Sequence, residues 1–158
     1  MKPAVYIETT IPSYLVARPS RDVVLAGHQQ ATRDFWNHRR NDFDLFISSY
    51  VLEESRGGEA AMAEQRLQSL RGIPLLLETP ESSALALRLV ARLNLPQRAE
   101  ADAYHIAIAA VNEMDFLLTW NCTHINNLHM LRRIEETCRG AGFVPPVIGT
   151  PEELISPP

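Results

Sequence analysis

Four oxygen-bearing side chains in this sequence stand beside apolar segments, where they could act together on a cation. Glu8 closes the apolar run AVYIE, and Glu54 follows the apolar run DLFIS within about two helical turns. Asp102 lies near the start of the almost wholly apolar stretch AEADAYHIAIAA, and Asn121 ends the segment FLLTWN. Carboxylate and amide oxygens are the ligands that Mg²⁺ and Mn²⁺ prefer. If the four converge, they predict a metal site suited to hydrolysis of a phosphodiester.

Each of these residues also has a purely structural interpretation. Glu8 could be a solvated side chain at the end of a strand, and Asp102 could complement the dipole at the start of its helix. Asn121 could cap the turn that follows it. Glu53 and Glu54 are adjacent, so only one of them is expected to face a common site. We expect Glu54 to face it and Glu53 to lie on the surface.

Several histidines and a cysteine near these residues invite further interpretations. His105 follows Asp102 by three residues, so it lies on a neighbouring face of the same predicted helix. It could contact a substrate, but a hydrogen-bonded structural histidine is the favoured interpretation. Cys122, His124 and His129 lack the paired spacing of structural zinc sites, so we expect no zinc site there.

The elements that must position these side chains alternate between strand and helix. The strands are expected at 4–8, 44–48, 73–77, 116–120 and 146–149. Helices are expected at 22–40, 81–94, 98–112 and 127–139, with a further helical face in GGEAAMAEQRLQSL. Strands that are nearly continuous in apolar residues and are separated by helices predict a parallel sheet covered on both faces. Ligands of such sheets bind beyond the carboxyl ends of the strands, where the four polar residues are expected.

Composition sets limits on the class of protein. The chain has 158 residues, 46% of them hydrophobic and 22% charged, which predicts one globular domain, 1–158, with a sizeable core. No apolar run approaches the ~20 residues that span a bilayer, and the N-terminus does not resemble a signal peptide. We therefore expect a cytoplasmic protein that is not bound to a membrane and keeps its two cysteines as free thiols. The net charge of −4 argues against a protein that coats nucleic acid by charge alone.

Four segments in order, YIETT, SSYVLEES, ADAYHIAIAA and LLTWN, resemble the signature segments of PIN-domain nucleases, in particular VapC-type toxins. The resemblance spans Tyr6 to about Leu154. It implies a three-layer α/β/α PIN-like fold with a central parallel sheet of four to five strands. It also implies a Mg²⁺- or Mn²⁺-dependent endoribonuclease, the toxin of a type II toxin–antitoxin pair, which hydrolyses RNA by metal-activated water. The implied partners are RNA, a protein antitoxin and a second copy of the chain in a homodimer.

By this resemblance Glu8, Glu54, Asp102 and Asn121 are the catalytic residues and metal ligands, and Thr119 is an accompanying hydroxyl. Two positions depart from the family pattern. The first acid is usually Asp, and Glu8 adds one methylene, roughly 1.5 Å of reach. The last acid is replaced by Asn121, whose amide ligates more weakly and removes one negative charge.

The two departures keep an alternative open, in which the chain is a catalytically impaired PIN-like domain that binds RNA or a protein. A third interpretation is a flavodoxin-like domain that binds a nucleotide or phosphate. That class would carry a glycine-rich loop after the first strand, and the segment TTIPSY has no glycine.

Overall fold

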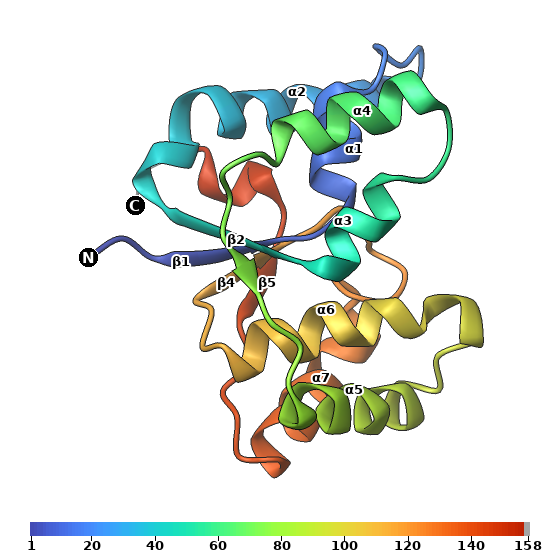
Figure 1. Cartoon of the computed structure of the whole chain (residues 1–158), viewed down its shortest axis with the longest axis vertical. Helices are drawn as coiled ribbons and strands as arrows, with labels where there is room; N and C mark the ends of the chain where they lie inside the picture. The colour runs from blue at the N-terminus through green and yellow to red at the C-terminus, as the bar shows by residue number, and fades with distance from the viewer. Residues whose placement is uncertain (157–158) are drawn as a thin grey trace.

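The computed structural model of the chain describes residues 1–156, which form one parallel sheet between two layers of helices (Figure 1). The strands are β1 (Ala4–Ile7), β2 (Asp44–Ser48), β3 (Leu75–Leu76), β4 (Phe116–Leu118) and β5 (Val147–Gly149). The helices are α1 (Thr10–Val16), α2 (Val23–Asp34), α3 (Ser49–Ser55), α4 (Ala60–Ser69), α5 (Pro80–Leu93), α6 (Glu100–Val111) and α7 (Leu128–Gly140). Short π or 3₁₀ turns cover Phe35–Arg39, Arg40–Asp42, Gln97–Ala99 and Pro151–Leu154.

The sheet has the strand order β3-β2-β1-β4-β5, and all of its pairings are parallel. Helices α1, α2 and α4 lie on one face and α5, α6 and α7 on the other, as Figure 1 shows. This arrangement confirms the predicted α/β class with a central parallel sheet. In the described part of the chain, no helix combines the length and apolar character needed to cross a membrane.

The central strand explains why the first apolar run is so short. Val5, Tyr6 and Ile7 are fully buried because β1 has a strand on each side and helices on both faces. Helix α6 packs equally deeply, and every residue from His105 to Ala110 is buried. Such a helix can have no polar stripe in this segment, which accounts for its continuous apolar sequence.

Most of the predicted element boundaries agree with the structure to within a few residues. Thr79 caps α5 through a reciprocal pair of hydrogen bonds with Ser82, and Pro80 occupies the first turn. The strand predicted at 73–77 is shorter, since only Leu75 and Leu76 pair with β2. The helix predicted at 22–40 continues beyond α2 as a π turn and a 3₁₀ turn.

Candidate metal centre

The pairing register of β1 and β4 places Glu8 at the carboxyl ends of the strands. Ile7 pairs with Leu118, so the next residues along each strand, Glu8 and Thr119, lie side by side. The backbone N–H of Glu8 donates to the carbonyl of Leu118 at 3.1 Å and continues the ladder by one bond. Helix α3 begins directly after β2 at Ser49, so it leaves the sheet at the same edge.

Glu8 is 3% exposed, and its carboxylate accepts hydrogen bonds from three donors. Its Oε2 accepts from Thr119 Oγ1 at 2.7 Å, from Thr10 Oγ1 at 2.5 Å and from the Thr10 backbone at 3.1 Å. Burial raises the pKa of this carboxyl, against the lowering effect of His105 and of these hydrogen bonds. A buried carboxylate bound on one oxygen keeps the other available for a cation.

Glu54 reaches the same place from the last turn of α3. Its Oε1 accepts from Thr9 Oγ1 at 2.8 Å and lies 2.5 Å from His105 Nε2. Burial raises the pKa of the Glu54 carboxyl, but the bond and charge of His105 outweigh that effect and the net shift is downward. Glu54 therefore stays ionised beside Glu8, although its side chain is 38% exposed. The adjacent Glu53 is exposed as well and lies outside the group formed by Glu8, Glu54 and His105.

His105 links this acid to the interior. Its ring is fully buried, and Nδ1 lies 2.6 Å from the hydroxyl of Tyr6, which in turn lies 2.7 Å from Ser48 Oγ. Burial lowers the pKa of His105, but the hydrogen bond to Glu54 and the nearby carboxylates outweigh it, so the net shift is upward. Both ring nitrogens are engaged, which agrees with the predicted hydrogen-bonded structural histidine.

These three residues form a group that could hold a metal ion. One ligand atom each from Glu8, Glu54 and His105 lies within 4.8 Å of the other two. Two carboxylates suit a hard divalent cation, and an imidazole nitrogen suits Mn²⁺ better than Mg²⁺. Because Glu54 Oε1 and His105 Nε2 already share a hydrogen bond, the imidazole is placed to orient Glu54 as a ligand.

Asp102 lies in the first turn of α6, one turn before His105. It stands next to this group rather than within it. Its Oδ2 is 3.0 Å from Nδ1 of His124, and its side chain is 13% exposed. Burial raises the pKa of the Asp102 carboxyl, although the nearby imidazoles and the Asn121 amide lower it. The His124 and Asn121 side chains both contact this carboxylate, and the part of Asp102 as a metal ligand stays a prediction.

Asn121 has a local task that accounts for its amide oxygen. Oδ1 accepts from the backbone N–H groups of Thr123 at 3.2 Å and His124 at 3.0 Å. The backbone N–H of Asn121 itself donates to Thr119 Oγ1 at 2.9 Å. Asn121 thus shapes the turn that carries His124 to Asp102. These hydrogen bonds do not test whether Asn121 also acts as a weak metal ligand, and that role stays a prediction.

Two contacts of the site went beyond the sequence reasoning. His124 was considered only as part of a zinc site, and the structure pairs it with Asp102 instead. The capping tendency of Asn121 was the available signal, since an asparagine that caps a turn fixes the residue three positions later. The sequence pattern assigns Thr10 no role of its own, and in the structure its hydroxyl donates a hydrogen bond to Glu8.

Fold and site together define a class: an α/β/α protein with a PIN-like five-stranded parallel sheet and a candidate acidic metal centre at the carboxyl ends of its strands. A scan against models of protein families and a search of curated proteins find no match.

A solved structure shares the fold over nearly the whole chain. It is the crystal structure of VapBC2 from Rickettsia felis bound to a DNA fragment from their promoter. The match covers 93% of this chain and 98% of that one, with a TM-score of 0.59 and 14% sequence identity. The PIN-like fold expected from the four segments is therefore confirmed.

Proposed function

We propose that this chain is a Mg²⁺- or Mn²⁺-dependent endoribonuclease of the PIN type. The observation that carries the proposal is the meeting of Glu8, Glu54 and His105 at the edge of the sheet where such folds bind their ligands. A divalent cation held there would lower the pKa of a water and would neutralise charge on a phosphate oxygen. Glu8 and Glu54 would hold it, with Asp102 and Asn121 as the further predicted ligands.

The other residues of the site prepare these ligands. Thr10 and Thr119 fix one oxygen of Glu8, which limits the rotamers of the longer glutamate side chain. His105 fixes Glu54 in the same way, because its own ring is locked by Tyr6. A first acid that is one methylene longer than aspartate is therefore compatible with a rigid metal centre.

A phosphodiester substrate agrees with the charge of the chain. The net charge of −4 offers no general attraction for a polyanion, so a cation at the acidic centre would supply the local positive charge.

We further propose that the chain is the toxin of a toxin–antitoxin pair. The support is its likeness in fold to VapBC2, whose structure was determined with promoter DNA.

Cleavage of an end-labelled RNA with Mn²⁺, with Mg²⁺ and with a chelator tests the activity. Asp102→Asn removes a charge at nearly constant shape, so we expect it to abolish metal-dependent cleavage. Glu53→Gln is the matched control, because Glu53 is exposed and adjacent to Glu54, and it should cleave as the wild type does.

Cleavage that persists in Asp102→Asn would contradict the assignment of this site. An absence of cleavage, together with no stabilisation by millimolar Mn²⁺, would favour the alternative of a binding module. The antitoxin is tested separately, by co-expression with the small DNA-binding-type protein that we expect to be encoded immediately upstream.

A further inference from the structure

We infer that Tyr14 and Tyr50 are the residues on which the bases on either side of the scissile phosphate stack when an unpaired RNA strand binds. This inference rests on the proposed function and deepens it, because it assigns the residues that would select unpaired RNA. The two tyrosines lie on opposite sides of Glu8 at the carboxyl edge of the sheet, where β1 lies between β2 and β4. Tyr50 belongs to α3, which begins directly after β2, and Tyr14 stacks on Trp120, which lies just beyond the end of β4.

The first aromatic group joins α3 to α6 beside the acidic centre. The rings of Tyr50 and Tyr104 stack with their centroids 4.8 Å apart and their planes 24° apart. Tyr50 precedes Glu54 by four residues, so the two side chains lie along one face of α3. The ring of Tyr50 also meets the ring of His105 edge-on, with the centroids 6.2 Å apart. This tyrosine pair therefore lies against the imidazole that is hydrogen-bonded to Glu54.

Tyr50 is anchored, and part of its side chain stays accessible. Its hydroxyl donates to Glu78 Oε2 at 3.2 Å, which fixes the ring at its far end. Burial and the charge of Glu78 raise the pKa of Tyr50, so the ring stays neutral. Tyr50 and Tyr104 are both only partly buried. A rigid, neutral pair of rings with accessible surface suits a further aromatic ring, because offset-stacked rings attract one another.

The second aromatic group lies on the other side of Glu8. The rings of Tyr14, His28 and Trp120 lie within 19° of parallel to one another. Trp120 is buried, whereas Tyr14 and His28 are partly exposed. Tyr14 follows Thr10 by four residues in α1, so the two side chains lie along one face of that helix. Because Thr10 is hydrogen-bonded to Glu8, this face of α1 borders the acidic centre.

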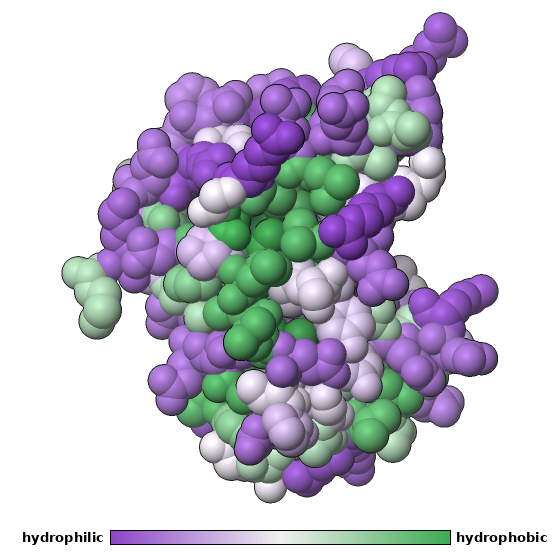
Figure 2. Space-filling model, viewed as in Figure 1, coloured by the Kyte–Doolittle hydropathy of each residue, from purple (hydrophilic) through white to green (hydrophobic). Residues whose placement is uncertain are grey.

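The shape and charge of this edge favour an unpaired strand that crosses the centre. In Figure 2 the outline of the molecule is indented on the side where α3 and the start of α6 lie, and hydrophilic side chains border the indentation. Stacking tolerates any base and needs no positive charge, so it would provide affinity for RNA in a chain of net charge −4. The bases of double-stranded RNA are already stacked within the helix and would gain no contact with the two tyrosines.

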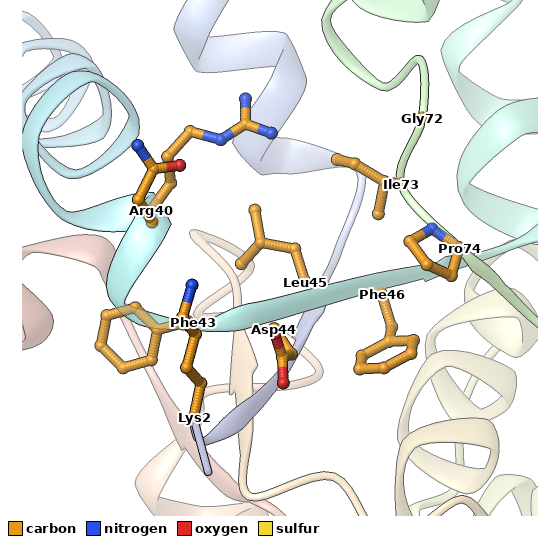
Figure 3. Close-up of a pocket in the computed structure, with 10 residues that line it drawn as sticks. Lys2, Arg40, Phe43, Asp44, Leu45, Phe46, Gly72, Ile73 and Pro74 are labelled. Atoms are coloured by element: carbon orange, nitrogen blue, oxygen red, sulfur yellow. The ribbon is translucent and has the colours of Figure 1, made fainter.

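A rival surface for RNA lies at the opposite edge of the sheet. A hollow of about 260 Å³ near the amino end of β2 includes Arg40, Phe43 and Asp44 in its lining (Figure 3). The guanidinium of Arg40 lies over the ring of Trp36, 4.4 Å from its centroid, so its charge is already engaged. Phe43 packs against other aromatic rings and is partly exposed, and the length of β2 separates it from Tyr50. Phe43→Leu is therefore the matched control for a tyrosine substitution.

Binding of a short, unstructured RNA to the full chain, measured by fluorescence anisotropy, tests this inference. The measurements use the Asp102→Asn background, in which we expect no cleavage. Tyr14→Leu and Tyr50→Leu should each weaken binding by roughly 5- to 150-fold, the effect of losing one stacked base. Tyr14→Phe and Tyr50→Phe keep the ring and should bind within about twofold of the background. Phe43→Leu should bind as the background does.

Abasic RNA distinguishes stacking from packing. An abasic nucleotide is moved along the RNA one position at a time. At two positions the missing base should weaken binding by the same factor as a tyrosine-to-leucine substitution, and the substitution should then have no further effect. A tyrosine that only packs α3 on α6, or α1 on Trp120, would lower the melting temperature and leave the dependence on each base unchanged.

The results separate this inference from the proposed nuclease. Metal-dependent cleavage together with unchanged RNA binding in Tyr14→Leu and Tyr50→Leu would overturn the stacking role and leave the nuclease intact. Base-dependent binding through the two tyrosines without any cleavage by the wild type would do the reverse. An absence of binding to unpaired RNA, equal affinity for single- and double-stranded RNA, or an equal loss in Phe43→Leu would also overturn the inference.

Discussion

Replacing Glu8 by Gln should separate two properties of this buried side chain, its ability to accept hydrogen bonds and its negative charge. The amide oxygen can still accept the hydrogen bonds from Thr10 and Thr119, so the shape of the site is kept and its charge is lost. Burial raises the pKa of Glu8, which means that the folded protein disfavours the ionised carboxyl. The metal-free Glu8→Gln protein should therefore be at least as stable as the wild type at neutral pH.

In the presence of Mn²⁺ the wild type should be more stable than Glu8→Gln. A ligand at 100 times its dissociation constant stabilises the folded wild type by about 2.7 kcal/mol. For a chain of this size that corresponds to a rise of roughly 5–11 °C in melting temperature. Loss of a direct ligand should weaken Mn²⁺ binding by about 100-fold or more, as even outer partners of ligands contribute 10–100-fold. At the same Mn²⁺ concentration the variant should then gain only about 0.4 kcal/mol, or roughly 1 °C.

Differential scanning fluorimetry over a Mn²⁺ titration measures both effects. Glu53→Gln provides the control, since it removes one charge from the same surface region without touching Glu8 or Glu54. The reasoning is refuted if Glu8→Gln keeps the full Mn²⁺ stabilisation, or if the metal-free variant is strongly destabilised. The first result would place the cation elsewhere, and the second would make Glu8 a structural carboxylate.

Three further predictions rest on the same contacts. His105→Ala should lower the free energy of unfolding by about 2–4 kcal/mol in urea denaturation, because it leaves a cavity and removes a buried partner of Tyr6. Asn121→Ala should cost about 1 kcal/mol, and Asn121→Asp should cost little, because only the latter keeps the acceptor for the turn. The raised pKa values of Glu8, Asp102 and His105 imply stability that is present at low pH and lost as pH rises through them. Metal-free protein should thus gain stability as the pH falls toward the ordinary carboxyl pKa of about 4.3, below which the lowered pKa of Glu54 acts in the opposite direction. Saturating Mn²⁺ should invert the slope above that pH because protons compete for the ligands. Slopes of the same sign with and without Mn²⁺ would contradict the shared site.

The sequence predicted the sheet and the helices well because each had a strong local signal. The run AVYIE is short, apolar up to its final Glu8 and rich in β-forming residues, which indicates a strand buried on both faces, and Thr79-Pro80 is a typical start of a helix. The strand at 73–77 was less well predicted. Its length depends on how far β2 runs beside it, and that is a property of the pair.

The choice of Glu54 over Glu53 shows where sequence reasoning reached its limit at the site. Both lie at a helix end beyond β2, and the hydrophobic pattern cannot tell which one points inward. Both glutamates are exposed in the structure, but only Glu54 is hydrogen-bonded to Thr9 and His105. Spacing along the chain carries no information on such contacts, since they join residues 45 and 51 positions apart.

By itself the sequence determined that strands and helices alternate, that the sheet is parallel, and that acids stand at the carboxyl ends of its strands. These follow from local periodicity and from the geometry that all parallel sheets share. Only the tertiary structure decided which donors surround each acid. The register of β1 and β4 places Glu8 beside Thr119. The turn at Asn121 brings His124 into contact with Asp102. His105, which is buried on all sides, is hydrogen-bonded to Glu54. Those pairings depend on distances between elements, which no single segment encodes.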